Sequence, residues 1–227
     1  MLLCIPDVLS AQEAKRCREA ALAADWEDGR ATAGPQSASV KTNRQLPLES
    51  PSGAALSETV SRALLANQLF LSAALPLRIL PPMFNRYGVG QTFGAHVDNA
   101  IRRVRGVDAT IRTDLSATLF LSDPESYEGG ELTIETASGA QAVKLPAGHM
   151  VLYPATSLHL VTPVTRGERI SSFFWVQSMI RSAERRSILF DLDQTIQDMQ
   201  ARTGPADENG VRLTGIYHNL IRQWAET

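Results

Sequence analysis

The spacing of apolar residues along the chain divides it into a helical start, a long β-rich centre and a helical end. Apolar residues recur at near-helical spacing over residues 54–74, whereas short extended runs separated by turns fill residues 77–178. Helical spacing returns after residue 178. This order predicts a mainly β protein with flanking helices.

The flanking helices are predicted from caps and apolar stripes. Ser10 and Glu13 have the spacing of a capping box, so a helix is expected from there to about Ala24. Gly, Ser, Thr, Pro and Asn are frequent in residues 27–53, which indicates a loop or an irregular extended segment. Three further helices are expected from their apolar spacing, over residues 54–74, 183–202 and 211–224.

The central region contains eight predicted strands, separated by turns such as Gly129-Gly130 and Ser138-Gly139. They are expected at residues 79–87, 92–97, 114–122, 131–136, 140–145, 149–153, 158–162 and 169–177. Eight short strands joined by turns suit a two-sheet jelly-roll barrel. We therefore predict a barrel domain with its N-terminal helices over residues 1–178, and a small C-terminal helical appendage over 179–227.

The composition is that of an ordinary globular protein. The chain has 227 residues, of which 44% are hydrophobic and 20% charged, enough to bury one good core. No apolar run approaches the roughly 18 to 20 residues that span a bilayer, and the start of the chain lacks the pattern of a signal peptide. A formal net charge of −2 gives no general reason to bind nucleic acid or membrane. We expect a cytoplasmic protein without either partner.

The candidate chemistry lies in two histidines and an aspartate. Side chains two apart in a strand point to the same face, so His96 and Asp98 can bind the same metal ion. His159, from a distant strand, completes two imidazoles and one carboxylate, the facial set that leaves about three positions open on non-haem Fe(II). A His-x-Asp pair also arises by chance in a chain with four histidines and 24 acidic residues, and the same ligands accept zinc or other divalent metals.

Arg169 and Ser171 form a candidate anion site. Arg169 lies ten residues beyond His159, enough for the chain to turn and return as another strand with this side chain directed inward. A guanidinium there can bind a carboxylate through paired charge-assisted hydrogen bonds. Ser171 is on the same face by alternation and can add a hydroxyl.

These residues and their surroundings resemble the Fe(II)- and 2-oxoglutarate-dependent dioxygenases, in which two His and one Asp hold iron. In that family a basic residue about ten positions past the distal His holds the far carboxylate of 2-oxoglutarate. The segments NRYGVGQTFGAHVD at 85–98, SATLFLS at 116–122 and EGGEL at 128–132 are similar to the prolyl-4-hydroxylase-like branch. Within it the chain most resembles the bacterial PKHD-type hydroxylases, including CIPDVL at 4–9, KTNRQL at 41–46 and the helical tail.

The resemblance implies a double-stranded β-helix and a hydroxylase that uses Fe(II) and 2-oxoglutarate and releases succinate and carbon dioxide. It adds L-ascorbate to the expected cofactors and a link to bacterial iron uptake. It assigns the iron to three residues, His96, Asp98 and His159. It assigns the far carboxylate of 2-oxoglutarate to Arg169, helped by Ser171, although prolyl hydroxylases commonly have Lys there, which argues against a prolyl substrate. Tyr87 either directs its hydroxyl to the cosubstrate or a ligand carboxylate, or is a core aromatic residue.

Four arginines follow Asp98, one of the predicted iron ligands: Arg102, Arg103, Arg105 and Arg112. They form either an ordinary solvated loop or a loop that closes over the active-site mouth and attracts an acidic substrate. The substrate class is expected to be a small molecule or a peptide, anionic if the second reading holds, and the sequence specifies no oligomeric state. Two other functions stay open at this point, a non-catalytic iron or 2-oxoglutarate sensor and a cupin-like zinc hydrolase or isomerase.

Overall fold

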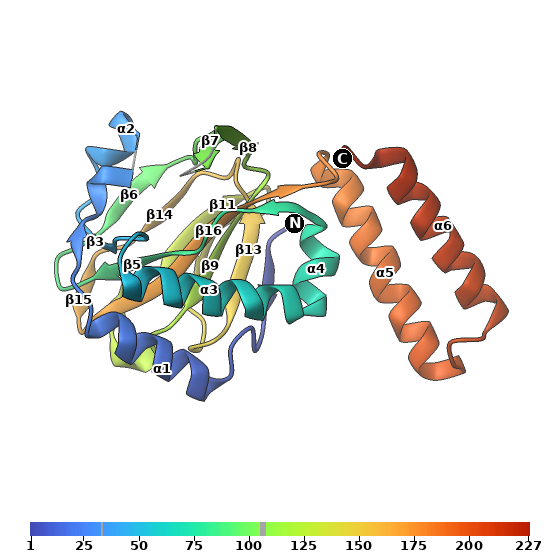
Figure 1. Cartoon of the computed structure of the whole chain (residues 1–227), viewed down its shortest axis with the longest axis horizontal. Coiled ribbons are helices and arrows are strands. Elements are labelled where there is room, and N and C mark those ends of the chain that lie inside the picture. The colour runs from blue at the N-terminus through green and yellow to red at the C-terminus, as the bar shows by residue number, and fades with distance from the viewer. Residues whose placement is uncertain (33, 105–107) are drawn as a thin grey trace.

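The computed structural model describes residues 1–32, 34–104 and 108–227 of the chain. Two β-sheets pack together, helices cross one side of them, and a helical hairpin extends from one end (Figure 1). The helices are α1 (Ala11–Leu22), α2 (Pro35–Ala38), α3 (Pro51–Ala66), α4 (Gln68–Ala74), α5 (Ala183–Thr203) and α6 (Glu208–Trp224), with 3-10 helices η1 (Gly29–Thr32) and η2 (Pro124–Ser126).

The larger sheet has eight strands in the order β1-β13-β9-β16-β5-β3-β2, with β4 also paired to β16. Its strands are β1 (Leu3–Ile5), β2 (Glu27–Asp28), β3 (Arg44–Leu46), β4 (Pro76–Ile79), β5 (Met83–Tyr87), β9 (Leu115–Phe120), β13 (Met150–Pro154) and β16 (Arg169–Ser178). Every pairing in it is antiparallel. The long strand β16 therefore runs through the middle of the sheet, with β9 on one side and β5 and β4 on the other.

The smaller sheet has four strands in the order β12-β11-β14-β6. These are β6 (Phe93–His96), β11 (Leu132–Thr136), β12 (Gly139–Val143) and β14 (His159–Val161); separate pairs are β7 (Ile101–Val104) with β8 (Ala109–Arg112), and β10 (Glu128–Gly129) with β15 (Val164–Arg166). An apolar cluster joins the sheets, with Phe120 and Val151 from the large one and Ile134 and Val161 from the small one. Among the described residues no strand pairing closes the sheets into a barrel, so the structure confirms a mainly β fold of two facing sheets.

The other face of the large sheet carries the main hydrophobic core, under α1, α3 and α4 (Figure 1). Val60, Leu64 and Phe70 from the helices pack in one cluster with Phe84 and Phe174 from the sheet. The Phe70 and Phe174 rings meet edge to face with centroids 6.2 Å apart. Complete burial of side chains of this size stabilises the fold by roughly 1.5–3 kcal/mol each. The helices thus hold one face of the sheet and leave the opposite face available for the pocket described below.

The first and last helices largely follow their predictions. Ser10 and Glu13 form the predicted capping box, because each side chain bonds the other residue's backbone amide. The helix α1 ends at Leu22 rather than Ala24, so its predicted end is wrong by two residues. The C-terminal helices α5 and α6 occur where apolar spacing places them.

The single helix predicted for residues 54–74 is wrong, because the structure has two helices there. The first begins earlier, at Pro51, in the N-terminal position where the missing amide hydrogen of proline does no harm. Asn67 has an extended backbone, and its side chain accepts a hydrogen bond from the Phe70 amide. Asparagine is a preferred N-cap, so it ends α3 and starts α4 within one continuous apolar stripe.

Strand predictions failed where proline or polar sequence hides the pattern. The strand expected at 79–87 is two strands, β4 and β5, because Pro81 and Pro82 supply no backbone donor. The segment 27–53, expected to be irregular, contains β2 and β3, which extend the large sheet beyond β5. These short polar strands show no clear alternation of apolar residues, so periodicity does not reveal them.

The helices α5 and α6 form an antiparallel hairpin at one end of the large sheet (Figure 1). Leu189 from α5 packs with Ile180 in a separate apolar cluster that α6 residues join. Ser72 of α4 donates its hydroxyl to an Asp193 carboxylate oxygen over 2.5 Å, which ties α5 to the main body. Within the part of the chain that the structure describes, no helix is both long and apolar enough to cross a membrane.

Candidate metal centre

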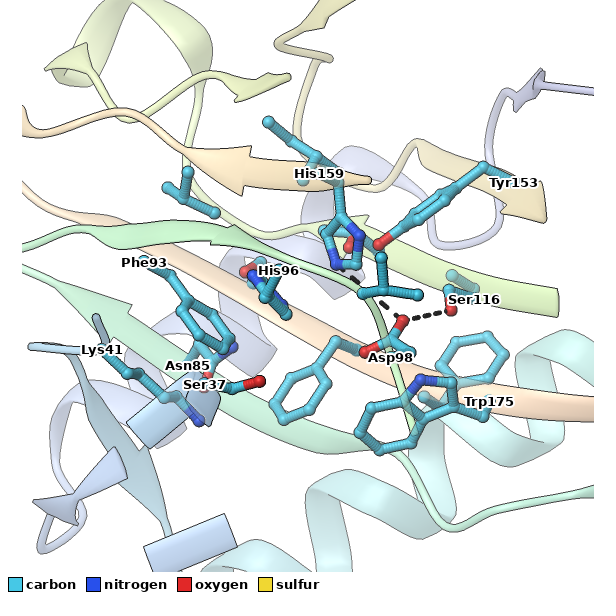
Figure 2. Close-up of a pocket in the computed structure, with 18 of the residues that line it drawn as sticks. Ser37, Lys41, Asn85, Phe93, His96, Asp98, Ser116, Tyr153, His159 and Trp175 are labelled. Atoms are coloured by element: carbon cyan, nitrogen blue, oxygen red, sulfur yellow. Dashed lines mark hydrogen bonds and ion pairs between the residues drawn. The ribbon is translucent and has the colours of Figure 1, made fainter. Parts of the chain in front are cut away.

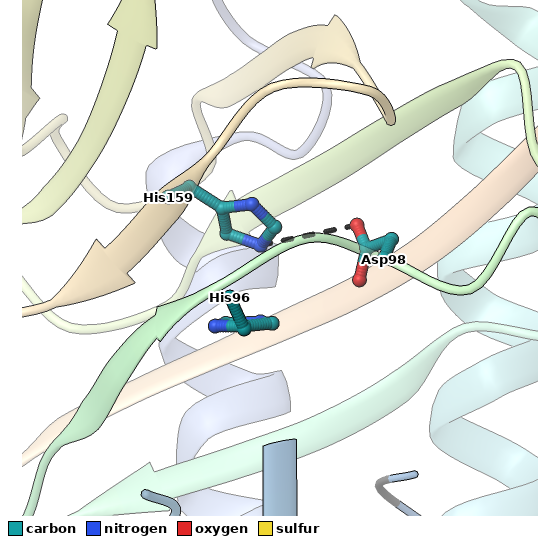
Figure 3. Close-up of side chains that lie close together, drawn as sticks. All are labelled: His96, Asp98 and His159. Atoms are coloured by element: carbon teal, nitrogen blue, oxygen red, sulfur yellow. Dashed lines mark ion pairs between the residues drawn. The ribbon is translucent and has the colours of Figure 1, made fainter. Parts of the chain in front are cut away.

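The pairing of β14 with β6 brings the two predicted histidines together. His159 lies opposite His96 in the register, and their ring centroids are 4.2 Å apart. Asp98 follows β6 directly, with its Oδ2 atom 3.8 Å from His159 Nε2 (Figure 3). Each of the three side chains offers one donor atom within 4.8 Å of the other two. Ser116 of β9 donates its hydroxyl to Asp98 Oδ2 over 2.6 Å, which holds the carboxylate in place (Figure 2).

Backbone carbonyl groups orient both imidazoles. His96 Nδ1 lies 2.8 Å from the Gly94 carbonyl oxygen, and His159 Nδ1 lies 3.0 Å from that of Ser157. A proton on each Nδ1 donates to these oxygens and leaves the Nε2 lone pair for a metal. Burial, followed by the neighbouring His159, lowers the pKa of His96, so its ring stays neutral as a metal ligand must.

Aromatic rings enclose the histidines. The Phe93 ring stacks on His96 with centroids 3.6 Å apart, and the Tyr153 ring meets His159 edge-on at 5.2 Å. Burial, and next the negative charge of Asp98, raise the pKa of Tyr153 well above its usual value. The Tyr153 hydroxyl therefore keeps its proton beside the three candidate ligands.

Arg169 is buried in the same pocket, with 1% of its surface exposed. Its guanidinium carbon lies 5.2 Å from the ring centroids of both Tyr87 and Phe120. Its Nη1 donates to Ser171 Oγ over 2.9 Å, but its Nε has no hydrogen-bond partner and no carboxylate pairs with it among the described residues. A buried guanidinium without a counter-ion is costly, and the arrangement fits an anion that enters the pocket.

Tyr87 was expected either to contact the cosubstrate or to be a core aromatic residue, and its position fits parts of both interpretations. It is a fully buried aromatic residue, and it also lines the pocket opposite Arg169 in the sheet register. Burial raises the pKa of Tyr87 to about 12, although the positive charge of Arg169 acts in the opposite direction. Its hydroxyl is therefore a donor at neutral pH. The structure brings all six predicted site residues to one pocket, whose lining includes His96, Asp98, His159, Arg169, Ser171 and Tyr87.

Several lining residues were missed by the sequence analysis. Lys41 comes from the segment that was expected to be irregular, and no spacing marks it. Ser116 and Trp175 lie on strands and carry a usable signal. Counting in twos from Ser171 along β16 reaches Trp175, and Ser116 lies directly opposite Trp175 on β9. Alternation along predicted strands could therefore have found the strand residues but not the lysine.

The arginine-rich segment after Asp98 is a β-hairpin, so its prediction as a loop is wrong. Arg102 of β7 lines the pocket, with its guanidinium carbon 3.9 Å from the centroid of a Trp175 ring. Arg103 is exposed, and Arg105 lies outside the described residues. The prediction that arginines reach the mouth of the site therefore holds for Arg102.

Arg112, the fourth arginine, forms ion pairs, which agrees with the first of the two interpretations of this segment. Its Nε donates to Asp114 Oδ1 over 2.7 Å, and its Nη1 donates to Glu226 Oε2 over 2.9 Å. Its Nη2 reaches the Ser178 carbonyl oxygen at 3.4 Å. The side chain links β8 to the end of β16 and to Glu226, two residues past the end of α6. It is not part of the pocket lining.

Two facing sheets that gather two histidines, an aspartate and a buried arginine in one pocket define an Fe(II)- and 2-oxoglutarate-dependent oxygenase. Residues 82–177 match the model of the 2OG-Fe(II) oxygenase superfamily, and residues 184–226 match that of the PKHD-type hydroxylase C-terminal domain. A PKHD-type hydroxylase from Burkholderia thailandensis is 57% identical over 226 residues, which cover 100% of both chains. The chain belongs to the PKHD-type hydroxylases, and the resemblance inferred from its sequence is confirmed.

Solved structures show the same fold at low sequence identity. A prolyl-4-hydroxylase from Pseudomonas putida is 21% identical with a TM-score of 0.53, covering 78% of this chain and 92% of that one. HygX from Streptomyces hygroscopicus, with nickel, 2-oxoglutarate and hygromycin B bound, is 18% identical with a TM-score of 0.54, covering 79% and 84%. Family and fold together make this chain an enzyme that uses Fe(II) and 2-oxoglutarate.

Proposed function

We propose that this enzyme uses O2 to hydroxylate a C–H bond of a small-molecule or peptide substrate: one oxygen atom enters the hydroxyl group of the product, and the other enters succinate as 2-oxoglutarate loses carbon dioxide. The observation that carries the proposal is a single pocket with three metal-binding side chains and a buried arginine that lacks a counter-ion. Bound iron and 2-oxoglutarate supply the oxygen chemistry. The residues of the chain bind these groups, orient them and keep water away.

Iron is assigned to His96, Asp98 and His159. Two neutral imidazoles and one carboxylate are donors that Fe(II) accepts on one face, which leaves the other face for cosubstrate and oxygen. The carbonyl hydrogen bonds at each Nδ1 and the Ser116 hydroxyl at Asp98 hold the donors before any metal arrives. Such supporting hydrogen bonds commonly change metal affinity by about 10- to 100-fold.

The far carboxylate of 2-oxoglutarate is assigned to Arg169. The unpartnered Nε and the uncompensated positive charge support this fit, because a carboxylate would satisfy both. Ser171, which accepts a hydrogen bond from Nη1, and the protonated hydroxyl of Tyr87 can add donors to the same oxygen atoms. An arginine offers a planar fork of donors, whereas the lysine common in prolyl hydroxylases offers one point charge.

Succinate formation tests this proposal against its alternatives. The purified protein is supplied with Fe(II) and 2-oxoglutarate, and fractions of cell extract are screened for stimulated succinate release and for a product heavier by one oxygen. Succinate that depends on His159 and Arg169 supports the proposal. Tight binding of iron and 2-oxoglutarate without succinate from any fraction would favour the sensor. Turnover with zinc in the absence of 2-oxoglutarate would favour the hydrolase or isomerase, which family membership does not support.

Five finer points are proposals that extend this function. The family resemblance supports L-ascorbate as a cofactor, a link to bacterial iron uptake, and a double-stranded β-helix formed by the two sheets. The amino-acid sequence supports a cytoplasmic location. The packing of α5 against α6 at one end of the large sheet supports a division into an oxygenase domain over residues 1–178 and an appendage over 179–227. Limited proteolysis near residue 178 tests the division, and growth of a deletion strain under iron limitation tests the link to iron uptake.

A further inference from the structure

A second group of cations and aromatic rings lines the pocket beside the residues assigned to iron and 2-oxoglutarate. Lys41 Nζ lies 5.1 Å from the ring centroid of Phe93 and 6.0 Å from that of Phe173. The Phe173 ring meets Trp175 edge-on at 5.5 Å, and Arg102 stacks over Trp175 at 3.9 Å. These contacts form a continuous row in the order Phe93, Lys41, Phe173, Trp175 and Arg102.

Lys41 is held in this row by the fold. A β-bridge pairs its backbone with that of Phe93, the ring that stacks on His96. Only 3% of the Lys41 surface is exposed. Burial, followed by the positive charge of Arg102, lowers the pKa of Lys41 to about 8, while the carboxylates of Asp28 and Asp98 act in the opposite direction. The Lys41 ammonium donates to Gln45 Oε1 over 3.3 Å, and it lies beside the Phe93 and Phe173 rings, close enough to Arg102 for the two charges to interact.

The charges of the pocket lining favour an anionic ligand beyond 2-oxoglutarate. Lys41, Arg102 and Arg169 are the cationic lining residues, and Asp98 is the one carboxylate in the described lining. The two positive charges of Fe(II) and the two negative charges of 2-oxoglutarate cancel. Counted over the lining residues alone, the filled pocket therefore has an excess of two positive charges, and Arg169 is already engaged by the cosubstrate in the proposed function. The remaining attraction lies with Lys41 and Arg102.

Asn85 adds a polar group on the Lys41 side of the pocket. It is buried on β5, and its side-chain oxygen has no hydrogen-bond partner among the described residues. Figure 2 shows Asn85 near Lys41 and Phe93, with Trp175 on the other side of Asp98. Buried polar atoms are nearly always satisfied, so an unsatisfied amide that lines a pocket indicates a group that a ligand completes.

We propose that Lys41 and Arg102 bind an anionic group of the substrate, a carboxylate or a phosphate, and that the apolar body of the substrate lies along Phe93, Phe173 and Trp175. This proposal rests on the proposed function and names its substrate class. The anion is held by the two cations, the rings contact the adjoining carbon skeleton, and a C–H bond of that skeleton faces the iron. Substrate selectivity then comes from these cations and aromatic rings rather than from the metal ligands.

Calorimetry under nitrogen tests the proposal with simple probes. The protein is first loaded with Fe(II) and 2-oxoglutarate, so that Arg169 is occupied before the probe is added. The probes are 3-phenylpropanoate, phenyl phosphate and the neutral 3-phenylpropanamide. We expect at least one anion to bind about tenfold or more tightly than the amide, and the preferred anion identifies the charged group. Lys41→Met and Arg102→Met should each weaken its binding by about tenfold or more, because each removes a charge-assisted contact.

Two matched control variants separate this effect from a general loss of stacked cations. Lys144 lies 4.1 Å from the Tyr127 ring centroid and Arg185 lies 5.2 Å from a Trp224 ring centroid, and neither lines the pocket. Lys144→Met and Arg185→Met should bind the anion as the wild type does. Lys41→Gln supplies a second neutral variant if Lys41→Met does not fold.

The outcomes of the two proposals are distinguishable. Failure of the wild-type protein to bind Fe(II) and 2-oxoglutarate would contradict the proposed function before any probe is added. If both bind normally but neither anion binds more tightly than the amide, the inference about Lys41 and Arg102 is wrong. It is also wrong if folded variants at both positions retain the wild-type affinity for the anion.

Discussion

Replacement of Arg169 by methionine separates cosubstrate binding from stability. Methionine has a similar length but no charge and no donors, so Arg169→Met removes the Nη1 bond to Ser171 and the unpartnered Nε together. A hydrogen bond to a charged group typically contributes about 1.5–3 kcal/mol. Loss of one such bond to the 2-oxoglutarate carboxylate would weaken its binding roughly 10- to 150-fold. A paired contact from the guanidinium fork would make the loss larger.

The free energy of unfolding of the same variant should stay the same or rise, although its affinity for 2-oxoglutarate falls. In the absence of 2-oxoglutarate the wild-type guanidinium is buried without a carboxylate partner among the described residues. Replacement of buried charges by apolar side chains of similar volume is often neutral or stabilising by about 1–4 kcal/mol. Arg169→Met should therefore unfold at the same or a higher temperature than the wild type without ligand. With 2-oxoglutarate at about 100 times its wild-type Kd, the wild type should gain about 2.7 kcal/mol, whereas a variant that binds roughly 10- to 150-fold more weakly should gain only about 0.3–1.4 kcal/mol.

Two measurements check this prediction. Titration of the charge-transfer absorption between Fe(II) and 2-oxoglutarate under nitrogen gives the affinity, and thermal unfolding with and without 2-oxoglutarate gives the stability. Arg186→Met is a matched control, because Arg186 is also buried but donates to the carbonyl oxygens of Ile180 and Arg181. It should lose stability and keep normal affinity. Unchanged 2-oxoglutarate affinity in Arg169→Met would refute the assignment of Arg169 as the anchor.

The remaining predictions concern the metal and the anion. His159→Ala should abolish or severely weaken Fe(II) binding in an anaerobic titration, and tight stoichiometric binding would remove this residue from the site. Ser116→Ala, which frees Asp98 Oδ2 from its 2.6 Å hydrogen bond, should lower Fe(II) affinity by about 10- to 100-fold without abolishing it. The affinity for the preferred anion should fall as pH rises through about 8, since burial lowers the pKa of Lys41 to about that value while Arg102 stays charged. Lys41→Met should show no such step, and the same step in that variant would assign the titration elsewhere.

The metal side of the pocket was predictable because its residues follow strand alternation. His96 and Asp98 are two apart, and so are Arg169 and Ser171, which places each pair on one face. Alternation does not show which strands become neighbours. The family resemblance supported the role of His159, but the pairing of β14 with β6, which sets His159 opposite His96, was not predicted.

The other side of the pocket was not predictable, for a physical reason. Lys41 belongs to the polar segment 27–53, and its place depends on a single bridge to Phe93, a residue about fifty positions away. Arg102 depends on the folding of a hairpin whose sequence has no apolar alternation. Long-range backbone contacts of this kind leave no periodic trace, so the sequence indicated an arginine-rich loop but not which arginine faces the substrate.

One guanidinium, that of Arg112, joins the end of the helical hairpin to the β7–β8 pair, which carries the pocket residue Arg102. Arg112 bonds Asp114 at the start of β9 and Glu226 beyond α6, and it lies on β8, the partner of the strand that carries Arg102. A partly exposed ion pair such as Arg112–Glu226 contributes roughly 0.2–1 kcal/mol, up to about a fivefold change in an equilibrium constant. One ion pair therefore ties the end of the helical hairpin to β8, the strand that pairs with the strand of Arg102.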